Sequence, residues 1–161
     1  MIQCGIVGWK NSGKTYLAQK LINYYTNKNY KVAAIKHAHH DFDIDKEGTD
    51  SFLLREAGAE QVIISSAKRW AKITELKNKE EMLLDKLILE LESPDILIIE
   101  GFKNLSHPKI EIINDNNYLF SRLKNVVCIV SDEKINTEIP QYKIIEIEKI
   151  ANLILENQSN E

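Results

Sequence analysis

The segment 8–15, GWKNSGKT, has residue types and a spacing that can hold a chain of phosphates. It fits the pattern G-x-x-x-x-G-K-[ST], in which backbone N–H groups of the loop surround the phosphate oxygens. Lys14 would reach the β- and γ-phosphates, and the Thr15 hydroxyl would bind Mg²⁺. The pattern predicts a phosphate-binding loop (P-loop), and the residues expected to contact the nucleotide are Gly8, Trp9, Lys10, Asn11, Ser12, Gly13, Lys14, Thr15 and Tyr16.

A second Mg²⁺ contact in such proteins usually comes from an acidic residue at the end of a buried strand. Glu100 has this position in DILIIEG (95–101), and Gly101 after it leaves room beside the phosphates. The alternative is an acidic residue that only caps the strand. Asp50 could bind the ion directly or through water. The predicted metal ligands are therefore Thr15, Asp50 and Glu100, and the predicted catalytic residues are Lys14, Lys36, Asp50 and Glu100.

The segment 36–51, KHAHHDFDIDKEGTDS, is rich in histidine and acidic residues. It could be a transition-metal site, a solvated loop, or an active-site loop at the carboxyl end of the second strand. Ligands bind at that edge of open α/β sheets, which favours the third interpretation. Lys36 would then stabilise phosphate charge. The residues expected to contact a ligand or partner are His37, His39, His40, Asp41 and Asp43.

Two further residues have one functional and one structural interpretation. Asp132 follows the strand VVCIV, where its carboxylate could accept two parallel hydrogen bonds from a nucleotide base; it could equally cap a turn. Arg69, beside Trp70, could contact phosphate as an arginine finger does. The alternative is a surface arginine next to a core tryptophan.

The elements that must position these residues alternate along the chain. Apolar runs predict strands, and apolar residues recurring with the helical period predict helices. Uniformly apolar strands separated by helices indicate an α/β, three-layer P-loop fold whose mainly parallel (mixed) sheet is covered by helices on both faces. One domain is expected over 1–161. Strands are predicted at 3–8, 31–37, 60–66, 70–76, 95–101, 109–113 and 126–131, and helices at 14–27, 50–58, 79–92 and 146–157.

The composition is that of an ordinary globular protein, with 43% hydrophobic and 28% charged residues and a formal net charge of −3. This charge gives no electrostatic reason to expect nucleic acid or an anionic membrane as a partner. Cys4 and Cys128 lie in apolar runs and are expected to be reduced core thiols. No segment is apolar for long enough to cross a membrane, so a cytoplasmic location is expected.

Four segments occur in an order that resembles the MobB family of molybdopterin-guanine dinucleotide biosynthesis adaptor proteins: GWKNSGKT, IKHAHHDFDIDKEGTDS, AKRWA and DILIIEGFK. The similarity extends from about residue 2 to about residue 155. It implies a cytoplasmic, homodimeric adaptor that binds GTP and Mg²⁺ and has weak GTPase activity. In that family the protein assists the molybdopterin guanylyltransferase, and a pterin ligand is a further expectation. By position, Glu100 corresponds to the Walker B residue, and Asp50 to an acidic Mg²⁺ ligand of related folds.

Two residues depart from relatives. Tyr16 stands where many have a second threonine, and Lys10 is third rather than second in the loop, which argues against the deviant Walker A ATPases. Spacing alone does not separate GTP from ATP; the resemblance favours GTP. Two other functions compete with the adaptor. One is a P-loop small-molecule kinase or ligase, and the other is a metal-delivery GTPase that carries its ion on the histidines of 37–40.

Overall fold

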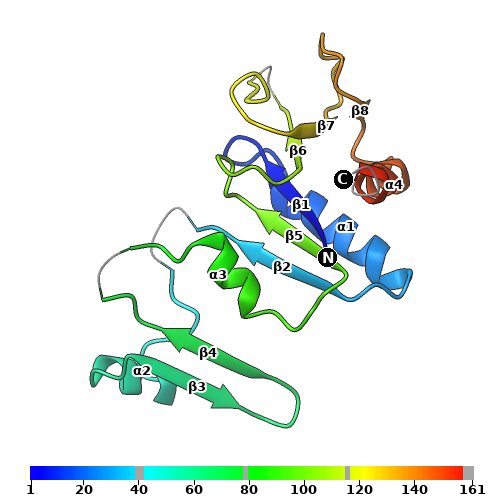
Figure 1. Ribbon diagram of the computed structural model, residues 1–161. Coiled ribbons are helices and arrows are strands. Elements are labelled where there is room, and N and C mark those ends of the chain that lie inside the picture. Colours follow the sequence, from blue (N-terminus) through cyan, green and yellow to red (C-terminus); the bar gives the residue numbers. More distant parts are fainter. Residues whose placement is uncertain (39–41, 78–79, 115–116, 158–161) are drawn as a thin grey trace. The chain divides into compact units, whose positions relative to one another are not determined.

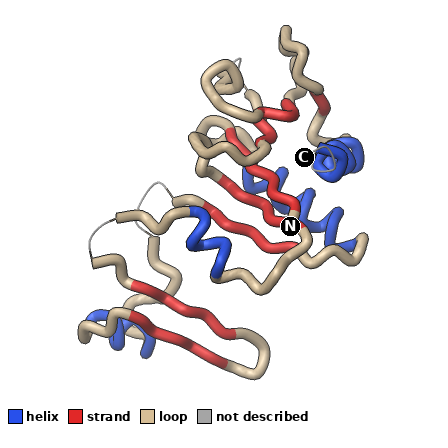
Figure 2. Tube along the Cα trace, viewed as in Figure 1, coloured by secondary structure: helices blue, strands red, loops and turns tan. Residues whose placement is uncertain are grey.

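The computed structural model describes residues 1–38, 42–77, 80–114 and 117–157 (Figures 1 and 2). Strands and helices alternate through most of this length. The strands are β1 (Ile2–Val7), β2 (Val32–Lys36), β3 (Gln61–Ser65), β4 (Trp70–Thr74), β5 (Ile96–Glu100), β6 (Lys109–Ile112), β7 (Val126–Val130) and β8 (Gln141–Tyr142). The helices are α1 (Lys14–Asn27), α2 (Asp50–Glu56), α3 (Leu84–Leu89) and α4 (Ile147–Asn157).

Within the described residues, six strands form one sheet in the order β2-β5-β1-β6-β7-β8. Every pairing in it is parallel, and the register sets Lys36 and Ile6 opposite Glu100. The carboxyl ends of β1, β2 and β5 therefore meet at one edge. The prediction of an α/β fold with a mainly parallel sheet is confirmed; the antiparallel pair, β3 and β4, forms a separate two-stranded sheet.

The central strand β5 is buried on both faces of the sheet. Its successive residues Leu97, Ile98 and Ile99 point to alternate faces and are 0%, 1% and 0% exposed. On one face α1 and α4 pack together against β1 and β5. Apolar residues spaced for a helix supply the inward side of α1, with Leu17 and Leu21 fully buried. This burial explains why 14–27 becomes a helix.

The chain divides into two compact units. The first comprises residues 1–37 and 87–161 and contains the six-stranded sheet; the second comprises residues 38–86 and contains α2, β3 and β4. The hairpin expected from the neighbouring strand patterns is confirmed, with Gln61 opposite Thr74. The expectation of a single domain over the whole chain stays a prediction.

Three details differ from the expected elements. The helix predicted over 79–92 is shorter, Leu84–Leu89, and Leu83 before it is 66% exposed. Trp70 is no core residue, since 60% of its surface is exposed. The two-residue strand β8 was not expected, because so short a segment carries no periodic pattern.

Candidate functional site

The P-loop leaves β1 and enters α1 through residues with positive φ. Gly8 has φ 146°, Asn11 has φ 62°, and Gly13, the N-cap of α1, has φ 97°. A Cβ on Gly8 would lie 2.5 Å from the Ile112 carbonyl oxygen and 2.7 Å from Ser12 Oγ, so only glycine fits there. Because Gly13 has no side chain, the first N–H groups of α1 receive no side-chain cap from it and can face an anion.

Lys14 lies across the inside of this loop. Its Nζ donates hydrogen bonds to the Gly8 carbonyl oxygen at 3.1 Å and to the Trp9 carbonyl oxygen at 2.6 Å. Partial burial lowers the pKa of the Lys14 ammonium; the Glu100 carboxylate opposes this shift, and the Lys36 charge adds to it. The ammonium is therefore held at the centre of the loop, where a phosphate chain would pass.

Thr15, Glu100 and Lys36 form a compact polar cluster at the shared edge of β1, β2 and β5. The Thr15 hydroxyl donates a hydrogen bond to Glu100 Oε2 at 2.9 Å. Lys36 Nζ lies 3.2 Å from Glu100 Oε1 and 3.5 Å from Thr15 Oγ1. The Glu100 side chain is only 14% exposed, whereas the Lys36 side chain is 61% exposed, so the cluster joins a half-buried carboxylate to an ammonium that water reaches. Three of the residues predicted from separate parts of the sequence thus come together.

The oxygens of this cluster fit Mg²⁺. The ion prefers hard oxygen ligands and commonly takes one or two from the protein, with phosphate oxygens and water completing an octahedron. A hydroxyl and a carboxylate oxygen already lie 2.9 Å apart here. Thr15 and Glu100 would hold the ion, and its charge would stabilise negative charge on the phosphates.

The turn after Glu100 brings an aromatic contact to the edge of this cluster. Gly101 has φ 100° and Phe102 has φ 48°, and the His37 N–H donates to the Glu100 carbonyl oxygen at 2.8 Å. The His37 and Phe102 rings stack with centroids 4.6 Å apart. A Cβ on Gly101 would lie 2.7 Å from His37 Cβ, so this close approach requires glycine. His37 therefore lies beside the site as part of a packed turn.

The remaining residues of the predicted ligand loop have different outcomes. His39, His40 and Asp41 lie outside the described residues. Asp50 is the exposed first residue of α2, in the second unit, and its role as a metal ligand stays a prediction. Where the structure describes the chain, no group of three or more His, Cys, Asp or Glu side chains could hold a metal ion.

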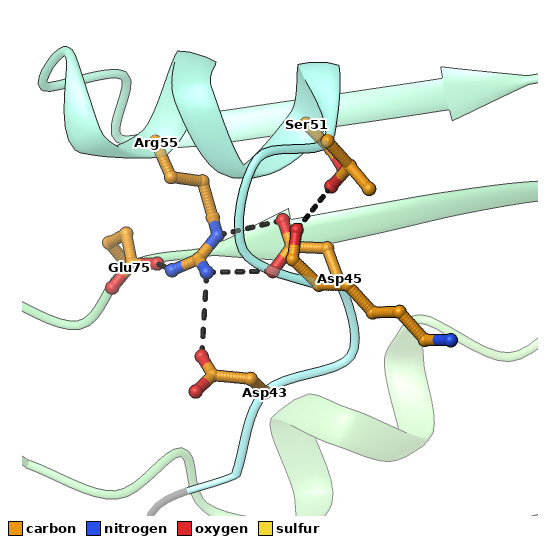
Figure 3. Close-up of polar contacts among 7 residues, drawn as sticks. Asp43, Asp45, Ser51, Arg55 and Glu75 are labelled. Atoms are coloured by element: carbon orange, nitrogen blue, oxygen red, sulfur yellow. Dashed lines mark hydrogen bonds and ion pairs between the residues drawn. The ribbon is translucent and has the colours of Figure 1, made fainter.

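Asp43 belongs to an ion-pair network centred on Arg55 (Figure 3). Arg55 donates to Asp45 through Nη2 at 2.7 Å and Nε at 3.1 Å, and to Glu75 through Nη1 at 2.6 Å. Asp43 is a weaker partner, 3.4 Å from Nη2 and 74% exposed. Hydrogen bonds from Arg55 hold the pKa of Asp45 below its usual range. Arg55 of α2 thus connects the acidic residues of this loop to Glu75, the residue after β4, a structural role that the sequence did not indicate.

Arg69 lies in the turn between β3 and β4. Its N–H donates to Ser66 Oγ at 3.3 Å, and its carbonyl oxygen accepts a bond from the Ser66 N–H at 2.9 Å. The side chain is exposed, and the neighbouring Trp70 is exposed too, which corrects the expectation of a core tryptophan. The arginine-finger interpretation stays a prediction.

A cavity of about 460 Å³ adjoins the P-loop on its β6 side. Asp132, the residue expected at the base, is not among the residues that line it; it is exposed and follows β7. Tyr16, at the start of α1, is 51% exposed. The cavity is lined by Trp9, Lys10, Asn11, Ser12, Asn114 and Asn117.

The sequence reasoning missed the two asparagines. Asn114 Nδ2 donates to the Ser12 carbonyl oxygen at 3.3 Å, so it fastens the P-loop to the segment after β6. The sequence could have identified them as candidate site residues, because the segment INDNN contains polar residues directly after a predicted buried strand. In a parallel sheet that position faces the ligand edge.

Three buried polar residues near β6 were also missed: His107, Lys109 and Glu111, exposed by 9%, 0% and 0%. Lys109 Nζ donates to the carbonyl oxygens of His107 at 2.7 Å and of Lys124 at 3.0 Å, and also to that of Leu105. Glu111 Oε1 accepts a bond from the Leu119 N–H, while burial raises the pKa of Glu111. These side chains fix the segments on either side of β6.

Comparison with known proteins identifies relatives over most of the chain. The family model described as "Molybdopterin guanine dinucleotide synthesis protein B" (MobB) matches residues 3–132. The chain is 35% identical over 154 residues to the molybdopterin-guanine dinucleotide biosynthesis adapter protein of Escherichia coli (strain K12), covering 92% of this chain and 88% of that protein. It is 42% identical over 108 residues to the Haemophilus influenzae adapter protein of the same name, covering 66% and 60%.

Solved structures agree with this comparison. A crystal structure of molybdopterin-guanine biosynthesis protein B superposes with a TM-score of 0.77 at 25% identity, over 96% of this chain and 97% of that one. A MobB homolog from Bacillus stearothermophilus matches over 100% of both chains with a TM-score of 0.76. At 17% identity the second match shows the fold alone. No helix in the described ranges is long and apolar enough to cross a membrane.

Proposed function

Because the chain belongs to the MobB family of molybdopterin guanine dinucleotide synthesis proteins, we propose that it is an adapter in the biosynthesis of that dinucleotide and that it binds GTP with Mg²⁺. The observation that carries the nucleotide site is the contact at 2.9 Å between the Thr15 hydroxyl and Glu100. It joins the end of the P-loop to the acidic residue of the neighbouring strand. A cap at the end of a strand would not require this pairing.

Different residues of the site would bind the phosphates and the ion. The loop N–H groups and Lys14 hold the phosphates, while Thr15 and Glu100 hold the ion. Lys36 keeps a positive charge 3.2 Å from Glu100, which moderates the negative charge of the carboxylate when no cation is present. The site thus has both the cationic and the anionic groups that a Mg²⁺–triphosphate complex needs.

We expect slow hydrolysis. P-loop GTPases hydrolyse GTP at roughly 10⁻⁴ to 10⁻³ per second without an arginine finger, and at about 10⁻² per second when an arginine of the same chain serves as one. Among the described residues, Thr15 Oγ1 contacts Glu100 and Lys36, and these two side chains form an ion pair with each other. The bound nucleotide would then organise a surface for a partner. The proposed partners are a second copy of the chain and the molybdopterin guanylyltransferase, in the cytoplasm.

Calorimetry tests the nucleotide site. Non-hydrolysable analogues of GTP and ATP are titrated with Mg²⁺ into the wild-type protein and Lys14→Ala. The variant loses charged hydrogen bonds to phosphate, so we expect its affinity to fall about 10²-fold or more. Lys20→Ala is the matched control, because Lys20 is an exposed lysine of the same helix.

Two results would contradict the proposal. Equal binding by wild type and Lys14→Ala would mean that the P-loop does not hold the phosphates. Stronger binding of the ATP analogue would refute GTP as the ligand. It would favour the alternative function, a small-molecule kinase or ligase. That function predicts a product whose formation depends on a second substrate.

A further inference from the structure

We propose that the cavity on the β6 side of the P-loop holds the heterocyclic base of the bound nucleotide, with Trp9 stacked on the base and Asn114 and Asn117 at its polar edge. This inference rests on the proposed nucleotide binding and adds the residues that recognise the base. Its starting point is the cavity itself, about 460 Å³ and contiguous with the loop. That volume lies within the range of small-molecule sites.

The position of the cavity agrees with a base rather than with phosphate. The strand order β2-β5-β1-β6 places β1, which leads into the P-loop, between two different neighbours. On the β5 side are the charged groups, Glu100 and Lys36, that suit Mg²⁺ and the terminal phosphates. On the β6 side the lining consists of Trp9 and amide, hydroxyl and lysine side chains. A nucleotide with its phosphates in the loop can therefore direct its base toward β6.

Trp9 has the shape and exposure needed for stacking. It is the second residue of the P-loop and lines the cavity, yet 53% of its surface is exposed. An indole ring beside a phosphate site can cover one face of a planar base. Such stacking is largely independent of sequence or base identity, because every base has a π-face.

The asparagines supply the polar contacts. A side-chain amide carries one acceptor oxygen and two N–H donors, so it can pair with a ring edge that presents both kinds of group. Asn114 is held against the P-loop by its bond to the Ser12 carbonyl oxygen at 3.3 Å. Asn117 is followed two residues later by Leu119, whose N–H is bound by the buried Glu111 carboxylate. Both asparagines are therefore attached to anchored backbone.

The test separates base contacts from phosphate contacts. Binding of the GTP analogue and of inorganic tripolyphosphate, each with Mg²⁺, is measured for wild type, Trp9→Ala and Trp9→Phe. We expect Trp9→Ala to weaken GTP binding roughly 5- to 150-fold, the usual effect of losing one stacked aromatic ring. Tripolyphosphate binding should not change, and Trp9→Phe should restore most of the GTP affinity. Asn117→Ala should also weaken GTP binding and leave tripolyphosphate binding unchanged.

Trp70→Ala is the matched control, since Trp70 is an equally exposed tryptophan of the second unit that does not line the cavity. Wild-type GTP binding with no loss in Trp9→Ala would overturn this inference and leave the proposed function intact. An equal loss of tripolyphosphate binding would also overturn it, because Trp9 would then shape the loop only. If the wild type binds tripolyphosphate but no nucleotide, the proposed function itself fails.

Discussion

Acidification should destabilise the folded chain through His107. This side chain is 9% exposed, and its Nε2 has no hydrogen-bond partner among the described residues. Burial, and then the nearby Lys109 charge, lower the pKa of His107 from 6.5 to about 4. The unfolded chain therefore takes up a proton near pH 6.5, whereas the folded chain resists protonation until about pH 4. Stability is complete above pH 6.5 and is lost as the pH falls toward 4.

The size of the effect follows from these two pKa values. Linkage with a pKa of 6.5 in the unfolded chain and about 4 in the folded chain gives a loss of roughly 2 to 3 kcal/mol in the free energy of unfolding between pH 7.5 and pH 4.5. Glu111 acts in the opposite sense above its ordinary pKa of 4.5, because burial raises the pKa of this carboxyl group. Other carboxylates contribute as well. A variant is therefore needed to isolate the histidine.

The measurement is urea unfolding at pH 7.5 and 4.5, followed by circular dichroism, for wild type and His107→Phe. The phenyl ring has a similar size and cannot titrate, so the free energy of unfolding of the variant should fall by roughly 2 to 3 kcal/mol less than that of wild type over this range. The His107 ring packs against Gly5, where an added Cβ would lie 2.6 Å from Nε2, so His107→Gln serves the same purpose if the phenylalanine does not fit there. The reasoning is refuted if wild type and variant lose equal stability on acidification.

Two further predictions concern the second unit and the core thiols. Asp45→Asn should lower the thermal stability of the chain more than Asp43→Asn, because Asp45 is 5% exposed and accepts two bonds from Arg55, whereas Asp43 is 74% exposed; equal melting temperatures for the two variants would contradict the proposed hierarchy. Cys4 and Cys128 should resist a thiol reagent until the chain unfolds, since both are buried and burial raises the pKa of Cys128 to about 12; rapid labelling of the native protein would disprove this.

The parts of the site that could be predicted are those with a strict spacing. The P-loop pattern fixes where glycine must take positive φ and where the lysine and threonine stand, and Gly8 and Gly13 fulfil it. Glu100 could be placed because its strand is uniformly apolar and ends at a glycine. Both inferences depend on local sequence, and the parallel register then brings the two segments together.

The parts that could not be predicted depend on contacts between distant residues. Charged residues are rarely buried, so nothing in the sequence KIEI suggests that Lys109 and Glu111 are inaccessible. Lys109 is paired with carbonyl groups from segments on both sides of β6, and Glu111 accepts a bond from the Leu119 N–H. The interpretation of Trp70 as a core tryptophan was wrong because β3 and β4 form only a two-stranded sheet, which has little interior.

The partners of the P-loop have a consequence for synthesis on the ribosome. The loop emerges early, but Thr15 is bonded to a residue 85 positions later, and Ser12 to one 102 positions later. At about 5–20 residues per second, roughly 5 to 20 s separate the loop from its last partner. During that interval the nascent chain contains the P-loop sequence but lacks one or both of its distant partners, Glu100 and Asn114. A chain interrupted before β6 would lack the contact with Asn114 permanently, so the proposed nucleotide would stabilise fully only chains whose synthesis has passed that strand.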